Sequence, residues 1–284
     1  MGSETPFEAQ REWFGRYLRA VLEEAEPITP DNVEVVELLL MEAELDAVRK
    51  ALADAGPPAF DPGQPVFASQ WGTTCMSTSL ANGMISMGEG LLVEGGEAQV
   101  HAFTSDIVES TSSFGKPGEY RSVDDLFKYL ESGRLGELDF EGAGFQGDFR
   151  VRLTNSLLDT CEALWTGRGR LVVQRRAHAH LVYGLELDGN TFWALTRDPM
   201  RRTGPGGERL AMEALRRDYL WSPLKKIPRL MGPHAFPQLS AEALLGHLER
   251  YDEMDNLGVD CPSALLFRAE DAPERRSEPP EEPE

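Results

Sequence analysis

The sequence predicts an α+β fold, and the spacing of its apolar residues carries that prediction. Residues 7–24 and 32–54 repeat apolar side chains every three or four positions, as amphipathic helices do. Three strand-like runs rich in apolar and β-branched residues lie further on, at 170–174, 178–187 and 191–196. We therefore expect helices first and an antiparallel sheet in the second half of the chain.

The N-terminal part, residues 1–60, is interpreted as a helical extension without chemistry of its own. Pro27 and Pro30 end its first helix, and Asp31 is predicted to cap the second. A cluster of prolines between residues 57 and 65 then interrupts the helical pattern. This interruption is the predicted boundary with the next domain.

Residues 61–232 are predicted to form the main domain. Helices are expected at 75–87, 122–130, 153–165 and 208–220. The tight turn Asp188-Gly189-Asn190 predicts that the second and third strand runs form a hairpin. Residues 233–268 are interpreted as a C-terminal helical segment, with a helix at 241–251. The last residues, 269–284, combine seven acids with four prolines and are predicted to be disordered.

Charge and cysteine content limit the classes of function. The formal net charge of the 284-residue chain is −20, so electrostatic attraction to nucleic acid or to an anionic membrane is not expected. The three cysteines, Cys75, Cys161 and Cys261, contain no C-x-x-C pair, which argues against a disulfide framework and against a cysteine-rich zinc site. No signal peptide or run of 18 apolar residues is present, so we expect a cytoplasmic protein, and export as an effector without a signal is compatible with the same sequence.

The segment around Cys75 carries the first candidate site residues. Cys75 opens a predicted helix, and a helix N-terminus stabilises a thiolate. Gln70 lies five residues earlier, where its side-chain amide can share the binding of an oxyanion with the backbone N–H of Cys75. Trp71 can shield the site from water and contact substrate. A lone cysteine is more often a buried structural residue, so this interpretation depends on partner residues elsewhere in the chain.

Those partners lie about a hundred residues further along the chain. His178 and His180 are two positions apart on a predicted strand and share one face, and only one of them is needed as a base. Asp198 ends the second arm of the hairpin, where its carboxylate can accept the Nδ1–H of the imidazole and leave Nε2 toward the thiol. The dipeptide Asp198-Pro199 is also a common way to open a turn. His180 is the second candidate for substrate contact.

The order of these features resembles the papain-like cysteine peptidase superfamily. It is most similar to the bacterial branch that includes double-glycine leader peptidases and type III effector cysteine proteases. The resemblance implies a Cys-bearing helix packed on an antiparallel sheet that carries His and Asp. It also implies that Gln70 supports the oxyanion, Cys75 is the nucleophile and Asp198 orients the base. His178 is preferred as that base because a glycine, Gly184, lies six residues after it.

The predicted function is hydrolysis of a peptide bond in a protein or peptide substrate, through an acyl-enzyme on Cys75. No metal or organic cofactor is required for this chemistry, and the sequence does not predict an oligomeric state. The same triad also suits an acyltransferase of the transglutaminase type or a glutamine deamidase, since all three reactions pass through a thioester. A non-catalytic interaction protein on the same fold, docking through its N-terminal helices, is the alternative from another class.

Overall fold

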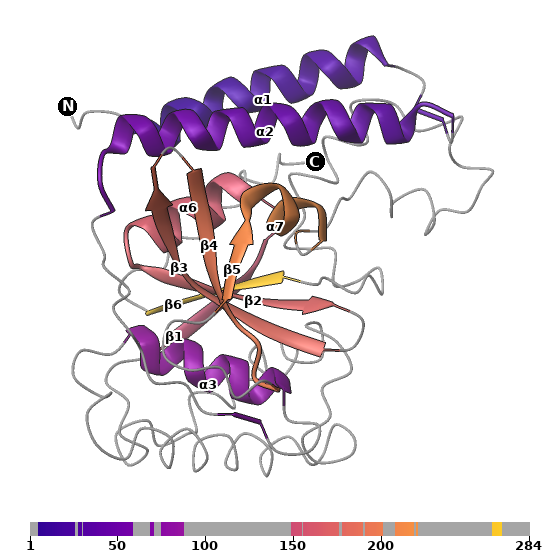
Figure 1. Cartoon of the computed structure of the whole chain (residues 1–284). Helices are drawn as coiled ribbons and strands as arrows, with labels where there is room; N and C mark the ends of the chain where they lie inside the picture. Colours follow the sequence, from indigo (N-terminus) through magenta and orange to yellow (C-terminus); the bar gives the residue numbers. More distant parts are fainter. Residues whose placement is uncertain are drawn as a thin grey trace, which may run out of the picture.

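The computed structural model describes residues 5–25, 28–29, 31–58, 69–70, 75–87, 149–154, 156–175, 178–189, 191–200, 208–218, 220 and 263–268. Over these residues the chain is an α+β protein in which helices cover both faces of an antiparallel sheet (Figure 1). The predicted fold class is confirmed at this level. The helices predicted at 122–130 and 241–251, and the acidic tail at 269–284, lie outside the described residues.

The sheet is the centre of the molecule. Its strands are β1 (Phe149–Leu153), β2 (Gly169–Arg175), β3 (His178–Asp188), β4 (Thr191–Arg197), β5 (Glu208–Ala211) and β6 (Ser263–Arg268). Their spatial order is β1-β6-β2-β3-β4-β5, and each neighbouring pair is antiparallel. The predicted hairpin is confirmed as β3–β4, with Gly189 at a φ of 62° in its turn, a conformation that glycine adopts without strain.

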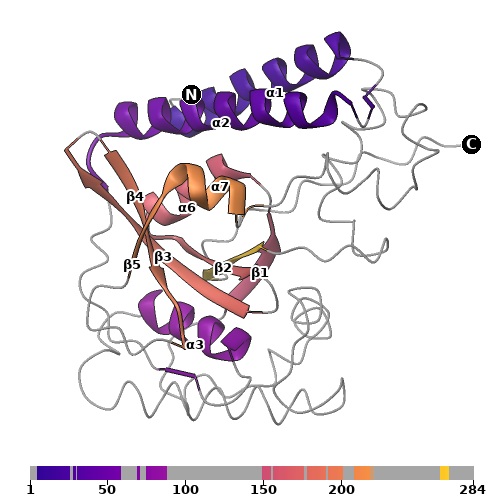
Figure 2. The same cartoon turned by 45° about the vertical axis from the view of Figure 1, so that its right-hand side comes forward.

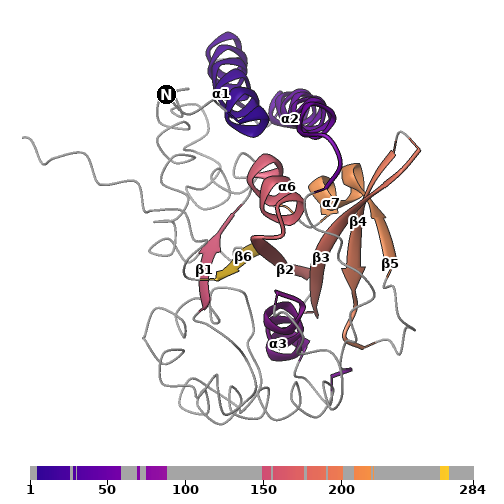
Figure 3. The same cartoon turned by 90° about the vertical axis from the view of Figure 1, so that its left-hand side faces the viewer.

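The helices form layers on the two faces of this sheet. One face carries α3 (Cys75–Met87), and the other carries α6 (Leu157–Trp165) and α7 (Met212–Asp218) (Figures 2 and 3). Helices α1 (Pro6–Glu24) and α2 (Val33–Ala55) lie side by side over α6 and α7 as an outer layer. None of the described helices is long and apolar enough to span a lipid bilayer.

The N-terminal helices share a hydrophobic core with the sheet. The buried cluster is formed jointly by these helices, α6 and the strands; it includes Phe7, Val48, Leu52, Leu164, Val173 and Leu185. Arg11 of α1 also pairs with Asp159 and Glu162 of α6. The helical extension is therefore packed onto the rest of the fold.

A buried ion-pair network joins three helices beneath this outer layer. Glu44 of α2 accepts a hydrogen bond from the backbone N–H of Leu157, the first residue of α6, at 2.7 Å. Its other carboxylate oxygen accepts from Nε of Arg216 on α7, at 2.6 Å. Glu37 lies 3.6 Å from the same guanidinium. One buried carboxylate thus caps α6 and binds the cation that α7 contributes.

The start of α2 differs from the prediction. Asn32, and not Asp31, is its N-cap residue. The side-chain oxygen of Asn32 accepts from the backbone N–H of Thr29 at 2.7 Å, and its amide nitrogen donates to the carbonyl of Ala25 at 3.2 Å. A side-chain amide can both donate and accept, whereas the carboxylate of Asp31 can only accept. Asn32 therefore joins the end of α1 to the start of α2.

Two further helix predictions are right only in part, and a third prediction of secondary structure is wrong. The helix predicted at 153–165 begins only at Leu157, after the N-cap Ser156, and residues 149–153 form β1. The helix predicted at 208–220 is divided into β5 and α7. Residues 263–268, assigned to a C-terminal helical segment, form β6 instead and pair with both β1 and β2. In each case, backbone pairing with another strand decides the structure.

Candidate active site

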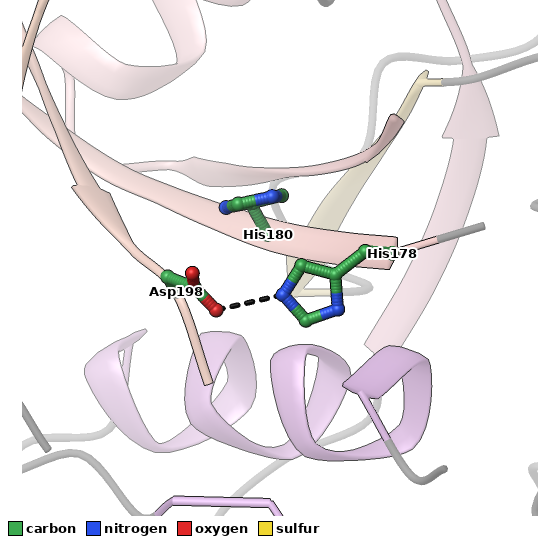
Figure 4. Close-up of side chains that lie close together, drawn as sticks. All are labelled: His178, His180 and Asp198. Carbon is green, nitrogen blue, oxygen red and sulfur yellow. Dashed lines mark hydrogen bonds and ion pairs between the residues drawn. The ribbon is translucent and has the colours of Figure 1, made fainter. Parts of the chain in front are cut away.

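The site lies where β3 begins and β4 ends. His178 is the first residue of β3, and Asp198 directly follows Arg197, the last residue of β4. Arg197 pairs with Leu181, so the next step of this antiparallel register aligns Asp198 with His180. His178 reaches across diagonally, and its Nε2 lies 2.7 Å from Oδ1 of Asp198 (Figure 4). The predicted contact between His178 and Asp198 is present in the structure.

The ring nitrogen that contacts Asp198 differs from the prediction. The sequence predicts that Nδ1–H bonds the carboxylate, whereas Nε2 does so. The reason is the diagonal position of Asp198, because Nε2 is further than Nδ1 from the backbone of His178 and so reaches the neighbouring strand. Nδ1 is therefore the nitrogen that can exchange a proton with a reacting group while Nε2–H holds the carboxylate.

The Asp198 carboxylate is fixed by its own turn. Its Oδ1 also accepts a hydrogen bond from the backbone N–H of Met200 at 2.9 Å, which forms an Asx turn around Pro199. Burial raises the pKa of Asp198. The hydrogen bonds from His178 and Met200, together with the charges of His178 and His180, lower this pKa by more than burial raises it, so the pKa lies below its ordinary value. Asp198 thus opens a turn and is a charged partner for His178 at neutral pH.

This lowered pKa predicts how the stability contributed by Asp198 depends on pH. The stabilisation is present above the ordinary carboxyl pKa of 3.8 and is lost as pH falls through the lower pKa of the folded protein. The difference in unfolding free energy between the wild-type protein and Asp198→Asn should therefore be present at about pH 5 and shrink as the pH falls below about 4. Urea unfolding at a series of pH values measures it, and a difference that stays constant down to about pH 2 would contradict this role for the carboxylate.

The segment that precedes the Cys75 helix is attached to the same turn. The backbone N–H of Gln70 donates to the carbonyl of Pro199 at 2.8 Å. Ser69 precedes Gln70 in the chain, and its Oγ lies 3.4 Å from the guanidinium of Arg197. The backbone of Gln70 is therefore joined to the turn that Asp198 opens.

Cys75 is the first residue of α3, as predicted, with a free and partly exposed thiol. Among the described residues, the side chains that gather within 4.8 Å of one another here are those of His178, His180 and Asp198, and Cys75 is not one of them. The structure thus brings the predicted base, the predicted acid and the Gln70 backbone together, with the thiol on the helix that comes after Gln70. Trp71, the predicted shield, lies outside the described residues.

Helix α3 is held on the sheet by close packing. A Cβ atom added at Gly83 would lie 3.0 Å from a methyl group of Leu266 and 3.2 Å from one of Leu181. Glycine at this position allows the helix to approach β3 and β6 closely. The packing fixes the axis of the helix that carries Cys75 relative to the strand that carries His178.

A buried arginine anchors the other end of α3. Arg170 of β2 is fully buried, and its guanidinium donates to the carbonyl and the hydroxyl of Ser86 at 2.8 and 2.9 Å. It also donates to the carbonyls of Gly169 and Gly167 at 2.8 and 3.2 Å. A cation at the C-terminal end of a helix is stabilised by the helix dipole. Sequence reasoning missed this residue because it treated Arg170 only as the start of a strand.

Replacing Arg170 with methionine should destabilise the protein by about 3 kcal/mol, because the carbonyls around it would be buried without their donor. Arg170→Lys should recover only part of this loss, since an ammonium lacks the planar fork of donors. Urea unfolding measures both effects. Arg168→Met is the matched control: this neighbour is exposed, and the change should cost less than about 0.5 kcal/mol. An equal loss of unfolding free energy in Arg168→Met and Arg170→Met would show that the buried hydrogen bonds of Arg170 do not stabilise the protein.

His180 completes the cluster. Its ring lies 4.7 Å from the ring of His178, centroid to centroid, with the planes at 75° (Figure 4). One donor atom from each of His178, His180 and Asp198 lies within 4.8 Å of the others. The sequence predicts separate roles for these residues, as base, substrate contact and orienting acid, and does not predict that their donor atoms converge.

No family model, curated protein or solved structure matches the chain. The resemblance to papain-like peptidases therefore stays a prediction from sequence motifs. The case for a function depends on the geometry of the site.

Proposed function

We propose that the protein is a thiol-dependent hydrolase that cleaves an amide bond through an acyl-enzyme on Cys75. The observation that carries this proposal is the 2.7 Å contact between His178 and Asp198. A carboxylate on one imidazole nitrogen fixes the tautomer, so the other nitrogen can act as a base. The Asx turn supports this role, because it holds the carboxylate in place without using the imidazole.

Each residue has a distinct role in the proposed reaction. Sγ of Cys75 attacks the substrate carbonyl carbon, and the thiol proton passes to Nδ1 of His178. Asp198 stabilises the imidazolium that forms. The C–N bond then breaks, His178 returns the proton to the leaving amine, and a thioester remains on Cys75. Water, activated by His178, hydrolyses the thioester and restores the thiol.

The oxyanion of each tetrahedral intermediate requires hydrogen-bond donors. The side-chain amide of Gln70 and the backbone N–H of Cys75 are the proposed donors. The hydrogen bond from the Gln70 backbone to Pro199 supports this assignment, because it joins the Gln70 segment to the turn that holds Asp198. The proposal requires Sγ of Cys75 to lie within reach of Nδ1 of His178 in the complex with substrate, and such catalytic contacts are often longer in a free enzyme.

The test is the product of the reaction. The full-length protein is incubated with a peptide mixture, and mass spectrometry distinguishes new N-termini, crosslinked peptides and deamidated glutamines. New N-termini support hydrolysis, whereas crosslinks or deamidation would assign the acyl-enzyme to the other two reactions. Cys75→Ala should give no product, and Asp198→Asn should turn over more slowly while remaining folded. Product formation by Cys75→Ala would reject the thiol mechanism.

A further inference from the structure

We propose that His178, His180 and Asp198 form a Zn²⁺-binding site, and that the bound ion blocks the proposed base. Two imidazoles and a carboxylate are ligands that zinc accepts, and three protein ligands with an open fourth position are a common zinc arrangement. The blocking effect rests on the proposed function, whereas the binding of zinc does not.

The distances suit this ion after small side-chain movements. Ligand atoms at about 2.0–2.1 Å from a tetrahedral zinc lie about 3.3 Å from one another. The donor atoms of the three side chains now lie within 4.8 Å of one another, and Nε2 of His178 lies 2.7 Å from Oδ1 of Asp198. The distance between Nε2 of His178 and Oδ1 of Asp198 must therefore increase slightly. Donor atoms of the cluster that lie further apart than about 3.3 Å must move closer together. Rotations about side-chain bonds supply movements of this size without a change in the backbone.

The surroundings of the three side chains favour a metal site in two ways. The backbone N–H of Met200 donates to Oδ1 of Asp198, and a hydrogen-bonded carboxylate is an ordered ligand. The side chains of His178 and Asp198 are 22% and 12% exposed, so an ion can reach them from solvent. Both histidines project from β3, a strand paired on both of its edges, which limits the cost of ordering the ligands.

Zinc bound through Nε2 of His178 would remove the proposed base, because a neutral imidazole that coordinates a metal through Nε2 carries its proton on Nδ1. Coordination by His178 and Asp198 replaces the hydrogen bond between them, which is the interaction that orients the base. With His178 bound to zinc, the thiol of Cys75 loses its proton acceptor. Zinc should therefore slow the reaction of Cys75 with an electrophile, and removal of zinc by a chelator should reverse this effect.

Calorimetric titration of the full-length protein with ZnCl₂ tests the binding. The wild-type protein should bind one Zn²⁺, and His180→Gln should weaken binding more than about 10-fold, since even partners outside the ligand shell contribute about 10–100-fold. Cys75→Ala should still bind, because the three proposed ligands do not include the thiol. His247→Gln removes a histidine that is not one of the three proposed ligands, and this variant should bind as the wild type does. No binding, or equal weakening by His180→Gln and His247→Gln, would overturn the proposal.

Alkylation of Cys75 by iodoacetamide, with and without zinc, tests the blocking effect. The ratio of the two rates is taken within each variant, so differences in intrinsic reactivity cancel. Zinc should slow the wild-type reaction and have little effect on His180→Gln at the same concentration. Binding without slowing would confirm the site and reject the blocking effect. If Cys75 is inert even without zinc, the proposed function fails, and calorimetry still decides whether the site exists.

Discussion

His178→Ala is expected to abolish fast alkylation of Cys75 at about pH 6, whereas His180→Ala should retain it. An isolated cysteine thiol of pKa about 8.5 is about 0.3% ionised at this pH, so rapid labelling there requires groups that stabilise the thiolate, and a neighbouring imidazolium is the strongest one proposed here. His178 is the histidine whose Nε2 contacts Asp198, so it is the ring that the carboxylate orients. Removing it should slow labelling by up to about 100-fold. The measurement is the rate of iodoacetamide incorporation, assigned by peptide mapping.

The chain contains its own control for this experiment. Cys161 is buried in α6, where burial and the nearby charge of Glu44 raise the pKa of its thiol well above its ordinary value. Its peptide should stay unlabelled in every folded variant, so labelling of Cys161 would reveal unfolding. Loss of labelling in His180→Ala alone would reject His178 as the base. Slow labelling of Cys75 in the wild-type protein would count against the whole thiol mechanism.

The second large effect concerns the buried network of Glu44 and Arg216. Arg216→Met should destabilise the protein by about 3–5 kcal/mol, because it leaves the carboxylates of Glu37 and Glu44 buried without their cation. The double variant Glu44→Gln/Arg216→Met should lose less than the sum of the two single changes, since it leaves fewer unpaired charges. Urea unfolding followed by circular dichroism measures these free energies.

An exposed ion pair between the same two helices serves as the control. Arg49 of α2 pairs with Glu213 of α7 and with Asp46, and about half of its side chain is in solvent. Arg49→Met should cost less than about 1 kcal/mol, because exposed ion pairs contribute little. A loss at Arg49 as large as the loss at Arg216 would show that burial of the network has no energetic consequence.

The features predicted correctly are those that short stretches of sequence encode. Helix α3 begins and ends at the predicted residues, and the β3–β4 hairpin has the predicted turn. The pairing of His178 with Asp198 results from that hairpin, because an antiparallel turn returns residue 198 to the start of β3. In these cases the structure depends on contacts between residues close in sequence.

The wrong predictions depend on pairing or packing with another element, which the local pattern of residues does not encode. The residues of β5, Glu208–Ala211, include good helix formers and become a strand because β4 offers them an edge. Strand β6 is a short apolar run, which has no alternation to distinguish it from a buried helix. Which nitrogen of His178 bonds Asp198 depends on a diagonal offset between strands, and residue spacing does not encode that offset. Arg170 is buried because its donors meet the end of a helix that lies far away in the chain, at Ser86.

The position of β6 has a consequence for how the protein is made. Residues 263–268 come last in the chain among the described strands, yet they lie between β1 and β2. Leu266 of this strand also packs where α3 approaches the sheet at Gly83. While the chain is being synthesised from its N-terminus, the cysteine helix and the histidine strand emerge well before the strand that completes their support. We therefore expect the surroundings of Cys75 to be complete only once β6 has emerged and paired with β1 and β2.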